Sequence, residues 1–423
     1  MLSKHKRPEN QTSKLPRVES FEVTAQGVQR LITRRDGSVV TTDYLSGIQG
    51  HEAADPNTVE KEWLRTRGAP DESGSGPSIS VVDLFSGCGG LSLGAREASR
   101  ALGFDFSPAL AIDFEPAAAA VYAKNFPSSR VLATDISLVF DRPVGATASR
   151  TESKIRRNIG EVDILMGGPP CQGHSDLNNR TRRMDPKNEL YFTMIRAAEV
   201  LEPKHVIIEN VPGAINDKSR VVQRSAEALS ELGYNVDFGV VDASSLGVPQ
   251  RRRRLILMAS RSRMPSVVDV EINHAREPRG LAWAIDDLTI TDPQDPFNQP
   301  ANSASETRRR IDFLFDNDLF DLPNEMRPEC HREKAHTYRS VYGRLKWGEP
   351  SPTMTTGFYS MCMGRYVHPS ERRTLTAHEA ARVQYFPDGF DFSAVASRTE
   401  LARMIGNAVP SRLAYAIVLE LLR

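Results

Sequence analysis

The sequence has few cysteines, no net charge and no long apolar run. Four cysteines in 423 residues do not make a disulfide framework, so we expect a reducing cytoplasm. No uninterrupted apolar stretch approaches the ~20 residues of a membrane-spanning helix. The N-terminus also lacks the apolar core of a secretory signal. These absences predict a cytoplasmic protein without a membrane partner.

Basic and acidic residues balance at 54 each, which argues against a protein that binds nucleic acid by charge alone. A local basic face is compatible with this balance. Arginines cluster at Arg180–Arg183, Arg251–Arg254 and Arg308–Arg310. Arginine forks suit phosphates and base edges, although we favour codon bias as the reason for the high arginine content.

Residues 1–76 have the features of an N-terminal appendage. Within it, Leu31–Thr42 predicts a β-hairpin, because Asp36-Gly37 supplies the positive φ angles of a type I′ turn. The segment Asp71–Pro77 is rich in glycine and serine, which predicts a flexible linker.

Strand and helix patterns alternate after the linker, which predicts an α/β fold with a doubly wound, mostly parallel sheet. The expected strands are Ile79–Phe85, Ala109–Asp113, Asp163–Met166, His205–Ile208, Val236–Val241 and Leu255–Met258. The expected helices are Leu91–Leu102, Pro116–Asn125, Glu189–Leu201, Val221–Leu232 and Ser411–Leu422. Residues 262–394 break this rhythm and predict a small, irregular region, which leaves 77–261 and 395–423 as the main domain.

A glycine loop follows the first expected strand, in Asp83-Leu-Phe-Ser-Gly-Cys-Gly-Gly90. Glycines between a strand and a helix let the backbone approach a ligand closely. Asp113 ends the next strand, where an α/β enzyme grips ribose hydroxyls, and Asp135 follows a further strand that lies between Asp113 and Asp163 in the chain. The spacing favours a nucleotide-type cofactor, while a role of either acid as a helix cap stays open.

The expected strand Asp163–Met166 leads into Gly167-Gly-Pro-Pro-Cys-Gln-Gly-His-Ser175. The prolines stiffen this segment, and Cys171 is expected at the carboxyl edge of the sheet, where ligands bind. A thiol becomes a strong nucleophile when nearby positive charge lowers its pKa. We expect the other three cysteines, Cys88, Cys330 and Cys362, to be small buried hydrophobes.

Charged residues follow at two further strand positions. Glu209 ends the strand that begins at His205 and could protonate a heterocycle, with a capping or salt-bridged glutamate as the alternative. In the arginine-rich strand, Arg252 and Arg254 share one face while Arg251 and Arg253 share the other, because side chains alternate along a strand. One pair is therefore expected to face the site.

A zinc site is the remaining alternative that the sequence raises. Its candidate ligands are Cys330, His331, His336, Cys362 and His368. Their spacing is not that of a paired Cys-x-x-Cys site, so we expect no bound metal.

Six motifs in this order resemble those of the DNA (cytosine-5)-methyltransferases: DLFSGCGG, GGPPCQGHS, ENV, QRRRR, RRTLTAHEAARVQYFPD and MIGNAVP. The resemblance spans residues 79–423 and implies a Rossmann-like fold that uses S-adenosylmethionine, with 262–394 as the target-recognition region. It implies methyl transfer to carbon 5 of a flipped-out cytosine in a specific duplex DNA sequence, through a covalent cysteine adduct. It also implies a bacterial restriction-modification or anti-phage system, a cytoplasmic and nucleoid-associated location, and a cognate restriction or defence protein as a second partner.

The resemblance also implies residue roles. Cys171 matches the nucleophile, Glu209 the acid that holds ring nitrogen 3, and Arg254 with Arg252 the pair near the carbonyl oxygen of the base. The implied contacts to S-adenosylmethionine are Phe85, Ser86, Gly87, Gly89, Gly90, Leu91, Asp113, Phe114, Asp135, Ile136, Pro169, Asn407 and Val409.

Two alternative functions stay open at this stage. The first is a tRNA cytosine-5 methyltransferase on the same framework, whose motif around the cysteine looks different from PPCQGHS. The second is a catalytically silent DNA-binding module, against which the intact set of Cys171, Glu209 and Arg254 argues. An NAD-dependent oxidoreductase would explain the glycine loop but neither the thiol nor the arginines.

Overall fold

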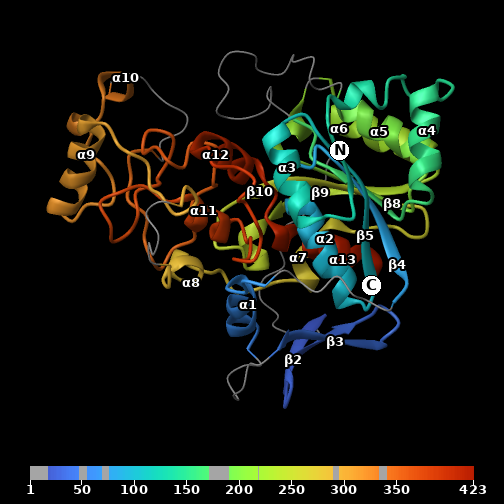
Figure 1. Ribbon diagram of the computed structural model, residues 1–423, viewed down its shortest axis with the longest axis horizontal. Coiled ribbons are helices and arrows are strands. Elements are labelled where there is room, and N and C mark those ends of the chain that lie inside the picture. Colours follow the sequence, from blue (N-terminus) through green and yellow to red (C-terminus); the bar gives the residue numbers. More distant parts are fainter. Residues whose placement is uncertain are drawn as a thin grey trace, which may run out of the picture.

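A seven-stranded sheet forms the centre of the molecule, in the order β6-β5-β4-β7-β8-β10-β9 (Figure 1). The computed structural model describes residues 18–46, 55–68, 76–170, 190–217, 219–288, 295–332 and 341–423. The strands are β4 (Ser78–Leu84), β5 (Asp105–Asp113), β6 (Arg130–Ala133), β7 (Ile164–Gly167), β8 (His205–Asn210), β9 (Asn235–Asp242) and β10 (Arg253–Ser260). The first five pair in parallel, whereas β10 runs antiparallel to both β8 and β9. The expected mostly parallel sheet is confirmed.

Helices cover both faces of this sheet (Figure 1). On one face pack α2 (Gly90–Ala101), α7 (Val267–Asn273) and α13 (Ser411–Leu422). On the other lie α4 (Arg150–Ile159), α5 (Leu190–Leu201) and α6 (Val221–Glu231). Successive strand residues serve opposite faces: Val81 belongs to the first core, and Val82 belongs to the second. The doubly wound arrangement expected from the sequence is therefore present.

A second lobe lies to the left in Figure 1 and contains α9 (Ser305–Asp316) and α10 (Glu329–Arg332). It has its own hydrophobic cluster, which includes Ile311, Leu314 and Tyr342. Strand pairing among the described residues of this lobe is limited to isolated bridges. This fits the expected irregular region, while the domain boundaries at 76, 261 and 394 stay predictions.

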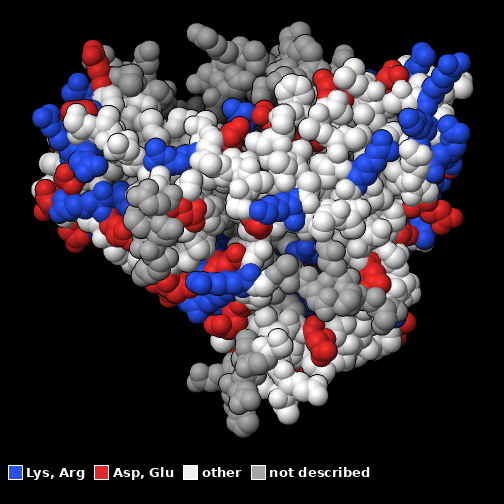
Figure 2. All heavy atoms as spheres, in the orientation of Figure 1, with Lys and Arg blue, Asp and Glu red and all other residues white. Residues whose placement is uncertain are grey.

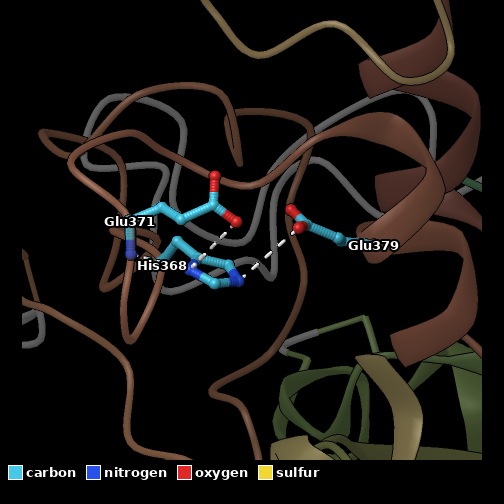
Figure 3. A group of neighbouring side chains, drawn as sticks. All are labelled: His368, Glu371 and Glu379. Carbon is cyan, nitrogen blue, oxygen red and sulfur yellow. Dashed lines mark hydrogen bonds and ion pairs between the residues drawn. The ribbon is translucent and has the colours of Figure 1, made fainter. Parts of the chain in front are cut away.

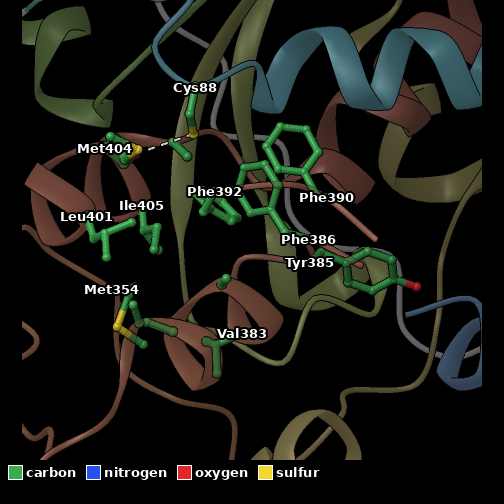
Figure 4. Close-up of a cluster of buried hydrophobic side chains, with 14 of the residues drawn as sticks. Cys88, Met354, Val383, Tyr385, Phe386, Phe390, Phe392, Leu401, Met404 and Ile405 are labelled. Atoms are coloured by element: carbon green, nitrogen blue, oxygen red, sulfur yellow. Dashed lines mark hydrogen bonds between the residues drawn. The ribbon is translucent and has the colours of Figure 1, made fainter. Parts of the chain in front are cut away.

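A further hydrophobic cluster joins the lobe to the sheet (Figure 4). It is built by α3 (Pro116–Asn125), α8 (Leu281–Ile285), α11 (Ala377–Val383) and α12 (Arg398–Asn407), together with the buried rings of Phe386, Phe390 and Phe392. Phe390 packs edge-on against Phe126, with ring centroids 6.3 Å apart. The QYFPDGFDF segment after α11 thus fastens the lobe to the sheet.

The described residues before the main sheet form a compact module. Strands β1 (Glu19–Thr24), β2 (Gly27–Thr33) and β3 (Val39–Ser46) make an antiparallel sheet, and α1 (Pro56–Leu64) follows. Residues 18–46 and 55–68 together are the N-terminal module. Val18 and Ile32 are buried in the same cluster as α2 and α13. The module is therefore packed into the core, which differs from the loosely linked appendage that the sequence suggested.

The expected hairpin is present as β2 and β3, but its turn differs from the prediction. Arg34 donates its backbone N–H to the carbonyl oxygen of Ser38 at 2.7 Å, so three residues close the loop. Of the Asp36-Gly37 pair only Gly37 has a positive φ, 84°. A type I′ turn needs two such residues, so the prediction of that turn type was wrong.

The most apolar helical stretch is the C-terminal one. Among the described residues, Arg398–Leu422 alone is long and apolar enough to cross a membrane by length and composition. However, 89% of its most apolar window is buried inside the protein, and Pro410 separates α12 from α13. This segment is therefore part of the buried hydrophobic clusters of the protein.

Candidate active site

The glycine loop at the end of β4 is anchored by the acid at the end of β5. Asp113 accepts hydrogen bonds from the backbone N–H of Gly87 at 2.7 Å and of Glu115 at 2.8 Å. Gly87 and Gly89 have φ angles of 54° and 100°, which glycine adopts most easily. Asp113 therefore fixes the loop and the turn into α3, whose N-cap is Glu115 without a side-chain cap, so the capping alternative left open by the sequence is not observed for Asp113.

Two side chains beside this loop offer groups that suit a nucleotide-type ligand, an exposed ring face and a hydroxyl that is free among the described residues. The side chain of Phe114 is 69% exposed, which is unusual for a large aromatic ring and leaves a face on which an adenine can stack. The hydroxyl of Ser86 is buried and has no hydrogen-bond partner among the described residues. Asp135 caps a short 3-10 helix that contains buried Ile136, by accepting from the N–H of Ser137 at 2.9 Å.

The turn between α12 and α13 closes on the glycine loop. A Cβ atom on Gly90 would lie 2.3 Å from the carbonyl oxygen of Val409, so only glycine permits this approach. Leu91 is buried beneath the same contact, and Asn407 stays exposed. The structure thus brings together the two distant segments, residues 85–91 and 407–409, that the sequence assigned to one cofactor site.

An ion pair stands at the carboxyl end of β8. The Nε atom of Arg254 lies 2.7 Å from Oε1 of Glu209, with side-chain exposures of 13% and 11%. Burial lowers the pKa of Arg254, while Glu209 raises it. The other oxygen of Glu209, Oε2, would lie 3.2 Å from a Cβ on Gly168. The pair therefore sits against the segment that leads to Cys171.

The prediction that alternate arginines share a face is confirmed. Arg252 and Arg254 point inward, whereas Arg251 and Arg253 are exposed. Arg252 is buried and donates to the carbonyl oxygen of Met354 at 3.0 Å and to that of Gly406 at 3.4 Å. Arg252 therefore connects the start of β10 to Met354 and to the end of α12, beside the arginine that binds Glu209.

Cys171 lies outside the described residues, as does the arginine-rich segment that follows it in the sequence, so the role of Cys171 stays a prediction. The approach to it is described as far as Pro170. Asn210, next to Glu209, donates its side-chain amide to the carbonyl oxygen of Pro169 at 2.9 Å. The end of β8 thus holds the Gly-Gly-Pro-Pro segment directly.

The other cysteines differ in their surroundings. Cys88 is buried, and its Sγ lies 3.8 Å from the carbonyl oxygen of Met404 (Figure 4). Burial raises the pKa of the Cys88 thiol to about 12, so this thiol is a poor nucleophile, as expected. Cys362 is exposed, so its prediction as a buried hydrophobe was wrong. The side chain of Cys330 lies outside the described residues.

Two glutamines that the sequence did not single out organise the site. Gln250 is fully buried, donates to Oε1 of Gln384 at 2.8 Å and accepts from the N–H of Met354 at 2.7 Å. Gln384 in turn donates to the carbonyl oxygens of Ile405 at 2.6 Å and Ala408 at 3.1 Å. A single buried amide leaves no periodic signal in a sequence. Gln250 directly precedes four arginines, so nothing in the sequence predicted that it is buried.

One described cluster has the residue types of a metal site: His368, Glu371 and Glu379 (Figure 3). The Nδ1 atom of His368 accepts from the backbone N–H groups of Ser370 and Glu371, at 3.2 and 3.0 Å. Both oxygens of Glu379 accept from Arg373, at 2.7 and 2.8 Å. Nδ1 of His368 and both carboxylate oxygens of Glu379 therefore already accept hydrogen bonds from residues 370–373.

Surface charge is mixed, in agreement with the balanced composition. On the face shown in Figure 2, basic side chains gather over α4 at the right and over α9 at the left, and acidic and basic side chains are interspersed between them. Within the Arg308–Arg310 cluster, Arg309 and Arg310 both pair with Glu306, at 3.5 and 3.1 Å. Arg310 also donates to the carbonyl oxygen of Met326 at 3.0 Å.

Comparisons with known proteins agree with this geometry. The model of the C-5 cytosine-specific DNA methylase family matches residues 79–423. Type II methyltransferase M1.BsuMI of Bacillus subtilis (strain 168) is 43% identical over 413 residues, which cover 96% of this chain and 95% of the relative. Since this alignment leaves only 4% of the chain uncovered, it extends into the N-terminal module.

More distant relatives support the same assignment. Type II methyltransferase M.DdeI of Desulfomicrobium norvegicum (strain DSM 1741 / NCIMB 8310) is 29% identical over 386 residues, which cover 80% of this chain and 87% of the relative. The crystal structure of a putative DNA modification methyltransferase encoded within an Escherichia coli prophage superposes with a TM-score of 0.57. The sequences are 26% identical, and the alignment covers 81% of this chain and 98% of the prophage protein. This chain belongs to the C-5 cytosine-specific DNA methylase family and is a DNA cytosine-5 methyltransferase.

Proposed function

We propose that this protein transfers a methyl group from S-adenosylmethionine to carbon 5 of a flipped-out cytosine in a specific duplex DNA sequence, through a covalent adduct of Cys171. The observation that carries the proposal is the 2.7 Å pair of Arg254 and Glu209, which lies against the Gly168 segment leading to Cys171. The target base has to leave the stack, because this chemistry cannot reach a ring inside a duplex.

Glu209 and Arg254 can each stabilise charge that develops on the cytosine ring during the reaction. Carbon 5 of cytosine is a poor nucleophile until a thiolate adds to carbon 6. Glu209 binds or protonates ring nitrogen 3 and so offsets the negative charge that this addition pushes into the ring. Arg254 holds Glu209 in place and stabilises charge on the carbonyl oxygen. After methylation a base removes the proton from carbon 5, and the C–S bond breaks to release Cys171 as a thiolate.

S-adenosylmethionine, when bound, supplies the methyl group on a positively charged sulfur. The described residues fit this cofactor, because the glycine loop, the exposed ring of Phe114 and the unpartnered hydroxyl of Ser86 meet at one edge of the sheet. The residues that would hold it are Phe85, Ser86, Gly87, Gly89, Gly90, Leu91, Asp113, Phe114, Asp135, Ile136, Pro169, Asn407 and Val409.

The names of the relatives support a biological setting. Both of the curated relatives named above are Type II methyltransferases. We therefore infer that this protein acts in a bacterial restriction-modification or anti-phage system, in the cytoplasm at the nucleoid, with a cognate restriction or defence protein as its partner.

Bisulfite sequencing of a host genome that expresses the protein tests the proposal. We expect methylated cytosines in one sequence context, and none in cells that express Cys171→Ala. Cys88→Ala is the matched control and should retain the methylation, because Cys88 is buried in the hydrophobic cluster. Transfer of a tritiated methyl group to duplex DNA and to tRNA separates the substrates. Labelling of tRNA alone would replace the DNA proposal with the RNA alternative.

A further inference from the structure

The N-terminal module is joined to the core by buried charges. Oε2 of Glu19 accepts from Arg276 at 2.5 Å and from Arg412 at 3.0 Å, and Oε1 accepts from the hydroxyl of Tyr415 at 2.5 Å. Oε1 of Glu60 lies 3.1 Å from Arg276 and 3.2 Å from Arg412. Burial alone would raise the pKa of both carboxyls, but the surrounding arginines lower it, so both glutamates stay charged.

The same module grips Tyr385, which follows α11. Oε2 of Glu60 accepts from the hydroxyl of Tyr385 at 3.0 Å and from Arg279 at 2.5 Å. The ring of Tyr385 is stacked between Trp63 of α1 and Trp283 of α8, with centroids 5.7 and 5.6 Å apart. Figure 4 shows the hydroxyl of Tyr385 pointing away from Phe386 and Phe390, toward the dark blue segment at the right edge of the picture. The module therefore fixes both the ring and the hydroxyl of Tyr385.

The backbone of Tyr385 holds the start of α13. Its φ angle is 66°, a left-handed conformation that a bulky aromatic residue rarely adopts and that surrounding contacts have to maintain. Its carbonyl oxygen accepts from the hydroxyl of Ser411 at 2.5 Å. The preceding residue, Gln384, donates to the carbonyl oxygens of Ile405 and Ala408. Two adjacent residues thus clamp the turn on both sides of Asn407 and Val409.

We propose that Glu60 and Trp63 of the N-terminal module are positioning residues for the cofactor pocket. They hold Tyr385 in its left-handed conformation, and the carbonyl oxygen of Tyr385 fixes the turn that presents Asn407 and Val409. This inference rests on the proposed use of S-adenosylmethionine, and it assigns the N-terminal module a direct part in binding it.

Glu60→Gln and Glu62→Gln make a matched pair of variants on the same helix. Glu62 contacts Arg65 at the surface, with 40% of its side chain exposed, whereas Glu60 is 1% exposed. Calorimetric titration with S-adenosylmethionine, well below the melting temperature, should show at least about tenfold weaker binding for Glu60→Gln. Glu62→Gln should stay within about twofold of the unaltered protein.

Substitutions of the rings test the route through Tyr385. Trp63→Ala should weaken cofactor binding, and Trp63→Phe should restore most of it by keeping a stacked ring. Tyr385→Phe removes the hydroxyl that donates to Glu60 and accepts from Arg279 at 3.1 Å, and it leaves Arg279 paired with Glu60. If Glu60 acts through Tyr385, the double variant should bind no more weakly than the weaker single variant. If Glu60→Gln does not fold, the affinity of Tyr385→Phe for S-adenosylmethionine tests the inference instead.

Affinity for duplex DNA is the measurement that separates positioning from general stability. We expect the dissociation constant for duplex DNA to stay within about twofold in folded Glu60→Gln and Tyr385→Phe, while the dissociation constant for S-adenosylmethionine rises. Unchanged cofactor affinity in both folded variants would overturn this inference and leave the proposed function intact. If the unaltered protein itself bound no S-adenosylmethionine, the proposed function would fail instead.

Discussion

Helices α2 and α13 approach each other so closely at Gly94 that one added methyl group should separate them. A Cβ atom at Gly94 would lie 2.4 Å from the carbonyl oxygen of Ser411, 2.5 Å from Cβ of Ala414 and 2.6 Å from the backbone nitrogen of Tyr415. Since ordinary contacts begin near 3.4 Å, Gly94→Ala requires the helices to move apart by about 1 Å. Two of the three atoms belong to backbone, so no side chain can rotate away.

The size of the effect follows from two opposed contributions. Overpacking of a close-packed core usually costs about 1–3 kcal/mol, and we expect the upper end because backbone has to move. Alanine gains about 1 kcal/mol over glycine within a helix, which offsets part of this cost. We therefore expect Gly94→Ala to lower the free energy of unfolding by about 2 kcal/mol. Affinity for S-adenosylmethionine should also fall, because Ser411 starts the helix that follows the cofactor turn.

Scanning calorimetry and urea unfolding measure this change. The melting temperature should fall by about 2 °C, because an unfolding entropy of about 2.1 cal/mol/K per residue makes the shift small in a chain of 423 residues. Gly348→Ala is the matched control, because a Cβ atom there meets nothing within 4 Å. A Gly94→Ala protein as stable as the unaltered chain, with the same cofactor affinity, would refute the close packing of α2 and α13.

Three further predictions concern the mechanism and the response to acid. Glu209→Gln should lower the methylation rate constant by at least about 100-fold while cofactor affinity changes little, because the amide cannot donate a proton in the same way. An equally fast variant would remove Glu209 from the mechanism. Duplex DNA with 5-fluorocytosine at the target position should trap the protein covalently when S-adenosylmethionine is present, since fluorine replaces the proton that must leave. Cys171→Ser should not be trapped and Cys88→Ser should be, and the reverse result would refute our choice of nucleophile. Burial raises the pKa of Glu420, but hydrogen bonds from His274 and the C-terminal arginine lower it to about 2. The stability that Glu420 contributes is therefore present above pH 4.5 and lost as pH falls from there toward 2, so urea unfolding of Glu420→Gln should depend less on pH in that window.

Local sequence patterns determined most of the elements of the main domain. The proline and alanine run of Pro116–Asn125 and the apolar face of Ser411–Leu422 form helices with the expected ends. The glycine loop lies between β4 and α2 as predicted, because only glycine tolerates its positive φ angles and close contacts. The two faces of the arginine strand also followed from alternation alone.

The turn of the hairpin and the exposure of Cys362 were predicted wrongly, because neighbours distant in sequence or a one-residue change in loop length decide them. The Asp36-Gly37 pair fits a two-residue loop and a three-residue loop equally well, and the pairing of Arg34 with Ser38 selected the longer one. A cysteine in an irregular segment has no period that reports its burial. The part of the site that includes Cys171 stays a prediction.

The sequence by itself determined the alternating elements, the glycine loop and the order of the motifs, because local backbone preferences and spacing along the chain encode them. Only the tertiary structure decided that the N-terminal module is part of the core. Glu19 and Glu60 are ordinary surface residues by composition, and their arginine partners lie more than 200 positions away, at Arg276 and Arg412. Buried ion pairs of this kind form only when folding brings distant segments together, so no local pattern can reveal them.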